Sequence, residues 1–312
     1  MKYLRIAVVF IFILSVAAYG AARYYDYQNH DSVPPEITIV GDQIDYDVKE
    51  PDTTPIMQGV TATDNRDGDI TSQVVVESMG PLLSDLTREV TYVVCDSYNN
   101  IARATRKIRL RKYSSPRWQI SKQLRFSTKD NANLSDYITA TDSIDEAISN
   151  RIRCTSGSYY DLSYPGGQEM SFQVTNSASD TSFLDVYVEV YDAELASFLP
   201  EIQLKKNIVN VKKDGTLDPY YVIESVNCGG RVYEVNRESR KINAPEGKRV
   251  RGLFGDRENI DEDDLIIEEL DFSDFHIESN LDLSTPGNYL IKYTIITEDG
   301  YATTVGLPVI VH

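Results

Sequence analysis

The most chemically suggestive residues in this 312-residue chain form an acidic loop, Asp64-Asn65-Arg66-Asp67-Gly68-Asp69. Ca²⁺ takes about six to eight oxygen ligands, so Asp64, Asp67 and Asp69 form a candidate calcium site. The spacing is not that of an EF-hand, because aligning Gly68 with the invariant glycine puts non-acidic residues at the first and last ligand positions. The alternative is a turn in which Asp64 and Asn65 cap backbone amides and Gly68 takes a positive φ.

A second acidic stretch runs from Asp256 to Asp274, inside a segment, 228–280, that a small β-domain does not require. A solvated loop or a short helix accounts for such a charge run. A docking surface for a basic partner or a second cation site is the functional alternative. The apolar residues Leu265-Ile266-Ile267 within it must pack somewhere, which argues against a disordered segment.

Catalytic motifs are not evident in the sequence. The three histidines are His30, His276 and His312, and the three cysteines are Cys95, Cys154 and Cys228. They form no Ser/His/Asp or Cys/His set, and the cysteines do not have the spacing of a metal site. We therefore expect that the protein is not an enzyme and that it has no cofactor apart from calcium.

Composition restricts the partners that the chain can have. The net charge of −17 and the pI of about 4.6 argue against a nucleic-acid partner, because phosphate contacts need clustered Lys and Arg. With 41% hydrophobic residues, the chain can form packed cores in two or three domains. Its 21 tyrosines favour a β-rich protein with half-exposed strands.

The N-terminus has the pattern of a membrane segment. Lys2 and Arg5 precede an uncharged run over residues 6–22, and Arg23 and Tyr24 follow it. This order predicts a positive-inside, single-pass anchor that ends in an interfacial aromatic belt. A cleaved signal peptide is the alternative, because small residues at the end of the run make a passable cleavage site, and the protein would then be secreted. Both outcomes place the remainder of the chain outside the cytoplasm.

The elements that would position the acidic loop are strands. In the first repeat the expected strands are 36–39, 44–48, 59–63, 74–78, 89–95 and 102–110, the last two joined by a turn at 96–100. The segment Ile138–Asp142 repeats Val60–Asp64 after about 78 residues, which favours tandem sandwiches of that size. A third closing hairpin is expected at 289–295 and 302–311.

The predicted fold is all-β, with tandem immunoglobulin-like β-sandwiches in single file, preceded by one N-terminal transmembrane helix. The expected boundaries are 1–23 for the anchor or signal segment, 24–33 for a linker, and 34–113, 114–193 and 194–312 for three domains. The second domain is degenerate, and the third carries the acidic insertion.

Three patterns together identify a family resemblance: Pro35-x-Ile37, Ala62-Thr63-Asp64-Asn65 with Asp67-Gly68-Asp69-Ile70-Thr71, and Thr91-Tyr92-x-Val94-x-Asp96-x-x-Asn99. This combination resembles the bacterial immunoglobulin-like domains of pesticidal crystal proteins and Gram-positive surface proteins. The closing part of the third repeat, Pro286-Gly287-x-Tyr289 onward, is also similar to them, whereas the second repeat lacks the Asn-x-Asp-Gly loop. The resemblance implies an extracellular sandwich that serves as a spacer or binding module without catalytic machinery.

We accordingly expect a non-catalytic, membrane-anchored bacterial cell-surface protein that acts in display, spacing or adhesion, with a surface protein or a glycan as its partner. The alternative is an accessory carbohydrate-binding module with a specific glycan ligand. Sugar ligands stack on exposed aromatic rings. The aromatic residues near predicted strand ends are Trp118, Tyr159, Tyr160, Tyr164, Tyr220 and Tyr221.

Overall fold

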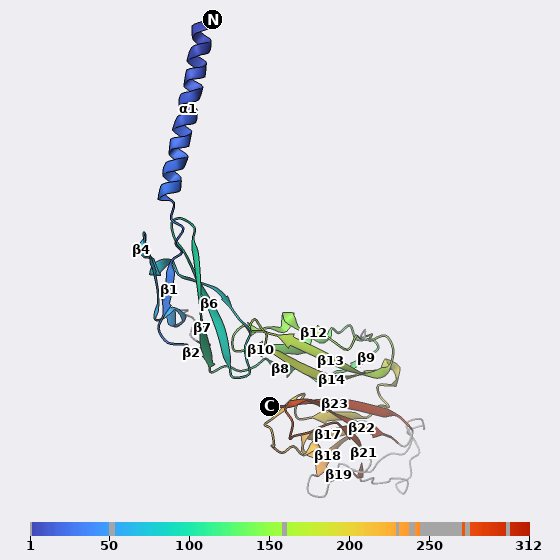
Figure 1. Ribbon diagram of the computed structural model, residues 1–312. Coiled ribbons are helices and arrows are strands. Elements are labelled where there is room, and N and C mark those ends of the chain that lie inside the picture. Colours follow the sequence, from blue (N-terminus) through green and yellow to red (C-terminus); the bar gives the residue numbers. More distant parts are fainter. Residues whose placement is uncertain are drawn as a thin grey trace, which may run out of the picture. The chain divides into compact units, whose positions relative to one another are not determined.

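The computed structural model describes residues 2–49, 54–157, 161–228, 231–236, 241–243, 270–271, 275–297 and 300–312. The chain divides into two compact units, Met1–Tyr113 and Ser114–His312 (Figure 1). After the N-terminal helix, strands make up most of the regular structure in the described residues, as the sequence predicts. The predicted domain boundaries stay predictions.

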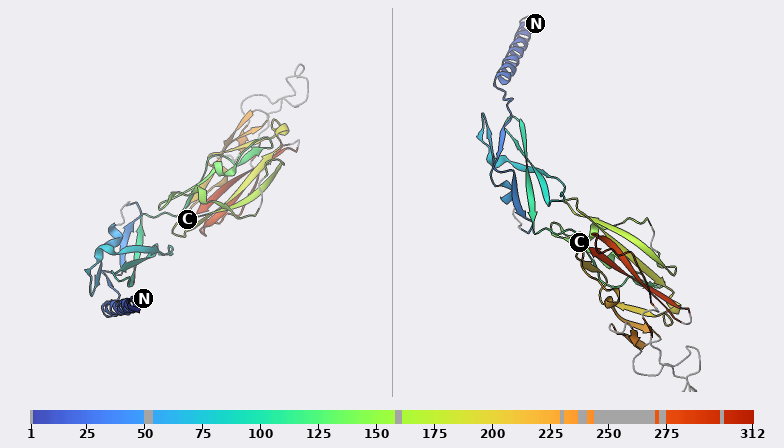
Figure 2. Two further views of the ribbon diagram at one scale, coloured as in Figure 1. Left: turned by 90° about the horizontal axis from the view of Figure 1, so that it is seen from above. Right: turned by 60° about the horizontal axis from the view of Figure 1, so that its bottom comes forward.

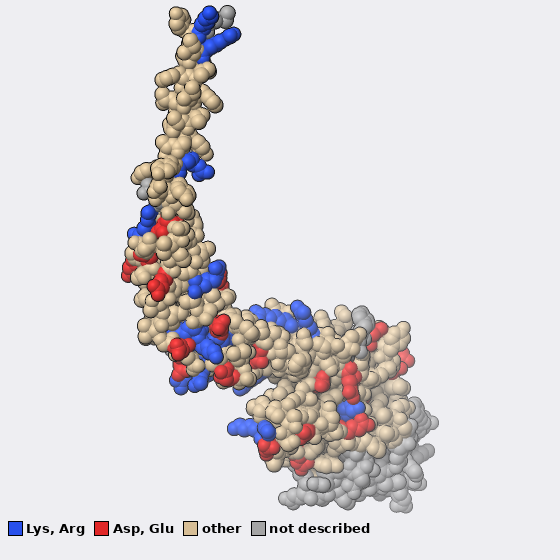
Figure 3. Space-filling view, viewed as in Figure 1, with Lys and Arg blue, Asp and Glu red and all other residues tan. Residues whose placement is uncertain are grey.

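Helix α1 spans Lys2–Asn29 and continues past residue 23, where the predicted anchor ends. The candidate membrane span Lys2–Tyr25 has 24 residues and contains an 18-residue window with a mean hydropathy of 2.2, none of which is buried inside the protein. Basic side chains lie only near the two ends of this stretch (Figure 3). At 1.5 Å per residue it is about 36 Å long, enough for a hydrocarbon core of about 30 Å. The helix passes the predicted end because no proline occurs before Pro34.

The first unit holds two sheets, with strand orders β1-β3-β4 and β2-β7-β6-β5. Its elements are β1 (Glu36–Ile39), β2 (Gln43–Asp47), α2 (Thr54–Met57), β3 (Val60–Asp64), β4 (Gly68–Asp69), a 3-10 turn (Thr71–Gln73), β5 (Val75–Met79), β6 (Thr87–Cys95) and β7 (Ile101–Arg111). The six predicted strands of this unit are confirmed to within two residues at each end. Buried and accessible side chains alternate along β6, so one of its faces belongs to the core.

A buried arginine ties the closing hairpin to the segment around α2. Arg106 of β7 is 3% exposed, and its Nη1 donates to the Gln58 carbonyl at 2.8 Å. Its Nη2 donates to the Ile56 carbonyl at 2.5 Å and to the Tyr92 hydroxyl at 3.0 Å. The Tyr92 hydroxyl itself donates to the Ile56 carbonyl at 2.7 Å. Buried carbonyls that would otherwise lose solvation are thus satisfied by the hairpin.

We expect Tyr92→Phe to destabilise the first unit by about 1–2 kcal/mol, because it removes one buried donor to Ile56 and one acceptor from Arg106. Native-state hydrogen exchange of β6 and β7 amides in the full chain measures the loss. Tyr289→Phe is the control, since the Tyr289 hydroxyl bonds to Thr285 at an exposed site. Unchanged protection in Tyr92→Phe would contradict the role given to this network.

The second unit holds four sheets, with orders β11-β10-β8, β12-β13-β14-β9, β15-β17-β18-β19-β20 and β16-β23-β22-β21. Its strands are β8 (Arg117–Ile120), β9 (Arg125–Ser127), β10 (Ile138–Asp142), β11 (Glu146–Ala147), β12 (Arg153–Cys154), β13 (Gly166–Thr175), β14 (Thr181–Tyr191), β15 (Glu201–Leu204), β16 (Val209–Val211), β17 (Ile223–Cys228), β18 (Arg231–Asn236), β19 (Lys241–Asn243), β20 (Leu270–Asp271), β21 (Phe275–Ser279), β22 (Gly287–Ile296) and β23 (Ala302–Val311). Short 3-10 turns lie at Leu134–Asp136, Ser149–Arg151, Ala193–Leu195 and Pro219–Val222.

One pairing scheme occurs three times along the chain. A first strand pairs antiparallel with the third, as in β1 with β3, β8 with β10 and β15 with β17. A second strand pairs in parallel with the last, as in β2 with β7, β9 with β14 and β16 with β23. The last strand also forms the closing hairpin with its predecessor. The internal repeat that the sequence predicts is therefore present in the strand topology.

The second unit has two hydrophobic cores, one from residues between Trp118 and Val188 and the other from residues between Ile202 and Val311. Strand β14 contacts β22 and β23, so these cores pack side by side, whereas the sequence predicted domains in single file (Figure 2). Glu189 of β14 joins them, accepting from the Thr304 amide at 2.7 Å and from Arg125 Nε at 2.6 Å. Burial raises the pKa of Glu189 above its ordinary value, although these two donors oppose the shift.

Gly306 on β23 sits where the two cores meet. A Cβ added there would lie 2.6 Å from the Cβ of Tyr187 on β14, closer than two non-bonded carbon atoms approach in proteins. We expect Gly306→Ala to destabilise the second unit by about 1–3 kcal/mol through overpacking. Trp118, the chain's one tryptophan, is buried in this unit, so its fluorescence during urea unfolding measures the loss.

Gly287→Ala on the neighbouring strand β22 is the matched control for Gly306→Ala. Its added Cβ would meet only the end of the Tyr289 side chain, at 3.3 Å. Equal unfolding midpoints for the two variants would contradict the close approach at Gly306.

Candidate cation site in the first unit

The acidic loop connects β3 to β4. Asp64 ends β3, and its Oδ1 accepts the backbone amides of Arg66 at 2.8 Å and Asp67 at 2.9 Å. Gly68 has a φ of 73°, which a residue with a side chain rarely adopts. The bonds from Asp67 and Arg66 lower the pKa of Asp64 below its ordinary value. The Asp64 cap and the positive φ of Gly68, two features of the turn that the sequence offered as the alternative to a calcium loop, are thus present.

The structure does not bring Asp64, Asp67 and Asp69 together as one ligand set. Asp67 turns to the β6–β7 turn, where its Oδ2 accepts the Ser97 amide at 2.7 Å and its Oδ1 accepts the Ser97 hydroxyl at 2.9 Å. Asp69 Oδ1 accepts the Thr71 amide at 2.9 Å. Asp67 and Asp69 are thus hydrogen-bonded to Ser97 and Thr71. Calcium binding by Asp64, Asp67 and Asp69 stays a prediction.

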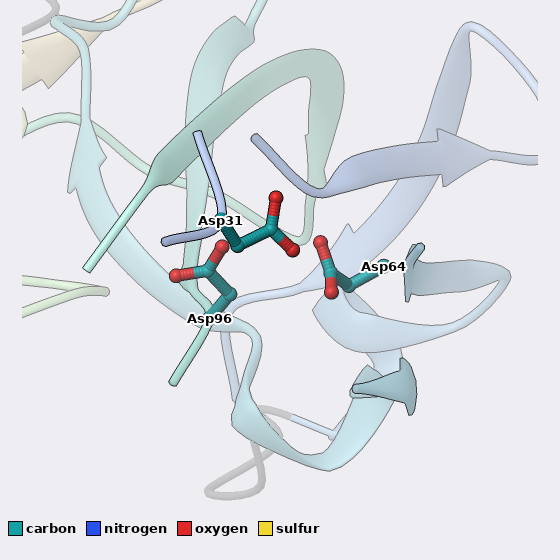
Figure 4. A group of neighbouring side chains, drawn as sticks. All are labelled: Asp31, Asp64 and Asp96. Carbon is teal, nitrogen blue, oxygen red and sulfur yellow. The ribbon is translucent and has the colours of Figure 1, made fainter. Parts of the chain in front are cut away.

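Asp64 instead belongs to a different group, in which it meets Asp31 and Asp96 (Figure 4). One carboxylate oxygen from each lies within 4.8 Å of the others. Asp31 is 4% exposed and Asp96 6% exposed, while Asp64 is half-buried. The three acids come from the segment after α1, from the end of β3 and from the turn after β6. The fold thus gathers three carboxylates that lie far apart in the sequence.

The hydrogen bonds of this group leave two buried oxygens unsatisfied. Asp96 Oδ1 accepts the amides of Tyr98 and Asn100 at 2.9 and 2.7 Å, and its Oδ2 accepts the Asn100 side-chain amide at 2.8 Å. Asp31 Oδ1 accepts the Val33 amide at 3.0 Å. The Oδ2 atoms of Asp31 and Asp64 are buried and accept no hydrogen bond. Buried carboxylate oxygens require such a partner, or a bound cation.

Arg66 is the cation that the structure places against this group. Its Nε lies 3.7 Å from Asp31 Oδ2, too far for a hydrogen bond. The Arg66 side chain is 40% exposed, and its guanidinium also lies over the Tyr98 ring and donates to the Tyr98 hydroxyl at 3.2 Å. Among the described residues, one guanidinium against three carboxylates leaves an excess of two negative charges. A set of oxygen ligands with this excess suits a hard divalent cation.

Sequence reasoning included Asp64 but missed the two acids that meet it. Asp31 lay in the expected linker, and Asp96 lay in the expected hairpin turn. The sequence did hold a signal for Asp96. The next repeat also has a short polar residue, Asn176, directly after its penultimate strand, which indicates that this position has a structural role. No local pattern marks Asp31, since its burial depends on the contact between the segment after α1 and the β6–β7 turn.

Of the remaining sequence candidates, His30 and Cys95 directly precede Asp31 and Asp96 in the chain, but neither belongs to the group of three acids. His276 lies exposed on β21, and His30 and His312 are also exposed. Cys95 is partly buried and Cys154 is exposed. Most of the acidic run 256–274 lies outside the described residues. That the chain has no catalytic activity stays a prediction.

We expect Asp67→Ala to lower the stability of the first unit by about 1 kcal/mol, since both its bonds to Ser97 are exposed to solvent. Hydrogen exchange of the Ser97 amide in the full chain reports this loss. The difference from the wild-type chain is expected to be equal with and without calcium, because the carboxylate supports a turn. A difference that appears only in calcium would reassign Asp67 as a ligand.

The sequence matches no family model, and no curated protein is a significant match. Among solved structures, the CBM51-2 and INT domains of Clostridium perfringens ZmpB with GlcNAc match at 17% identity and a TM-score of 0.20, over 51% of this chain and 42% of that chain. The ZmpB M60 catalytic domain with CBM51-1 and CBM51-2 matches at 13% identity and a TM-score of 0.21, over 90% of this chain and 31% of that chain. The protocadherin gammaB7 EC3-6 cis-dimer matches at 11% identity and a TM-score of 0.20, over 90% of this chain and 74% of that chain.

This chain spans less than half the length of the two ZmpB structures. At these scores the comparisons assign no family. The resemblance to the bacterial immunoglobulin-like domains of pesticidal crystal proteins and surface proteins stays a prediction.

Proposed function

We propose that this protein is a non-catalytic, membrane-anchored surface protein whose immunoglobulin-like repeats act outside the cell in display, spacing or adhesion. The observation that carries the proposal is α1, whose apolar stretch Lys2–Tyr25 is exposed along its length. Transfer of this surface out of water is favourable, and a lipid bilayer provides the apolar environment. Lys2 and Arg5 on one side favour a cytoplasmic N-terminus.

The repeated strand scheme supports a spacing or display role. Each copy closes with a long hairpin, β6–β7, β13–β14 or β22–β23, and buries its own apolar residues. The acidic surface, with a net charge of −17, favours solubility outside the cell and disfavours anionic polymers as partners. A surface protein or a glycan is the partner that this role implies.

The anchor is tested by expressing the full chain in bacterial cells and separating membranes after an alkaline wash. We expect the chain in the membrane pellet, with residues 6–22 present by mass spectrometry and with the strand-bearing part cleaved by protease added to intact cells. Ile11→Lys, which puts a charge in the middle of the apolar stretch, should reduce membrane insertion. A soluble chain that begins after residue 22 would establish secretion instead.

A glycan-binding module is the second candidate, favoured by one surface feature. Tyr164 is 73% exposed beside a shallow hollow that Asp161 and Gln168 also line. An exposed ring next to polar groups is the arrangement on which sugars stack. Trp118 does not contribute, because it is buried in a core, and Tyr159 and Tyr160 lie outside the described residues. Binding of the full chain to cell-wall glycans that is lost in Tyr164→Ala and kept in Tyr221→Ala would favour this candidate over spacing.

A further inference from the structure

The second repeat contains a near copy of the acid group, with one decisive exchange. Asp142 Oδ1 accepts the amides two and three residues ahead, as Asp64 Oδ1 does in the first repeat. Asn176 Oδ1 accepts the amides two and four residues ahead, as Asp96 Oδ1 does. The two repeats therefore share the capping bonds of the loop and of the turn, although the other loop residues differ, and the facing pair differs in one side chain.

That exchange changes how the facing carboxylate is satisfied. In the second repeat Asn176 Nδ2 donates to Asp142 Oδ2 at 2.5 Å, so the buried pair is complete. In the first repeat Asp96 offers no donor, and Asp64 Oδ2 is left without a hydrogen bond. Asp31 adds a third carboxylate, and its own buried Oδ2 also accepts no hydrogen bond. A cation, which accepts electron pairs from oxygen, would satisfy the two buried oxygens of the first repeat. The second repeat needs no cation, because Asn176 satisfies Asp142.

The dimensions of the group suit calcium. Oxygens on opposite sides of one Ca²⁺ lie about 4.6–5.2 Å apart, since each Ca–O distance is about 2.3–2.6 Å. The three carboxylate oxygens lie within 4.8 Å of one another. Mg²⁺ demands near-octahedral geometry at shorter distances, whereas Ca²⁺ accepts irregular sets, as expected of acids from three separate segments. Water can fill the remaining positions through the half-buried side at Asp64.

We propose that Asp31, Asp64 and Asp96 bind one Ca²⁺ that fixes the segment between α1 and β1 to the strands of the first unit. That segment already has two contacts with the rest of the unit, because Asn100 Nδ2 donates to the Asp31 carbonyl at 3.1 Å and Arg66 Nε lies 3.7 Å from Asp31 Oδ2. The ion adds a bridge from Asp31 to β3 and to the β6–β7 turn. Calcium outside the cell would thereby control how firmly the strands are joined to the membrane anchor, which is a property beyond the display role itself.

The test measures Ca²⁺ binding by calorimetry to the full chain in nanodiscs of neutral phosphatidylcholine. We expect one Ca²⁺ per chain with a Kd of about 0.1–1 mM, the range of extracellular modules. Asp96→Asn is the decisive variant, because it removes one carboxylate but keeps an Oδ1 that can accept the Tyr98 and Asn100 amides, although it gives up the bond from the Asn100 side chain. Asp96→Asn and Asp31→Asn should each weaken binding at least about tenfold. Asp69→Asn, in the same acidic loop but outside the group, should bind as the wild-type chain does.

Hydrogen exchange provides a second readout in the same samples. Calcium should slow exchange of the Val33 and Asn100 amides in the wild-type chain and in Asp69→Asn, and should leave exchange unchanged in Asp96→Asn. Without calcium, exchange in Asp96→Asn should stay close to that of the wild-type chain, because the variant loses the bond from the Asn100 side chain but also one of the mutually repelling carboxylates.

Three results would overturn the proposal. The first is no binding by the wild-type chain up to 10 mM Ca²⁺, which is about tenfold above the weakest Kd expected. The second is equal weakening by Asp69→Asn, which would place the ion in the loop. The third is equal affinity for Mg²⁺, which would remove the calcium assignment. None of these results bears on membrane retention, so a failure here is distinguishable from a failure of the anchor.

Discussion

Each repeat of this protein depends on one strand that is hydrogen-bonded along both edges. Strands β7, β14 and β23 each pair antiparallel with the preceding strand and in parallel with a short strand from much earlier in the chain. The hairpin half of this arrangement is local, whereas the parallel half requires closure of a long loop. Because closure opposes folding with an entropy cost, the apolar burial along the hairpins must supply the compensating free energy. The other elements of a repeat are arranged around this central strand.

In the first and second repeats, polar contacts at one end hold the loop after the third strand against the turn of the closing hairpin. Both repeats cap the backbone amides with short polar side chains, Asp64 and Asp96 in one and Asp142 and Asn176 in the other. Where the pair is an acid and an amide, it is satisfied within the protein. Where the pair is two acids, the two buried negative charges require a positively charged partner.

Much of the strand pattern was predictable from the sequence, and the lateral packing was not. Alternation of apolar residues located the hairpin strands, because burial of one face of a strand repeats every two residues. The two-residue strand β4 is too short to carry a period, so it was read as loop. The contact of β14 with β22 and β23 was missed because outward-facing residues such as Glu189 and Thr304 read as solvent-exposed positions. In the structure these residues pair with each other.

The candidate site divides in the same way. Asp64 could be found, because its loop has an unusual density of acids, but its partners there were assigned by proximity in sequence. Asp67 and Asp69 are satisfied by Ser97 and Thr71, which no count of acids reveals. The partners that meet Asp64 depend on how the β6–β7 turn and the segment after α1 fold over it. Such convergence is a tertiary property, and one sequence read along its length does not contain it explicitly.

The absence of a side chain at Gly306 has a consequence for related chains. With Tyr187 so close, a relative that joins its last two cores in this way must keep glycine there or move the tyrosine. In an alignment, the residues at these two positions taken together therefore indicate which chains can join their last two cores along their flanks in this way.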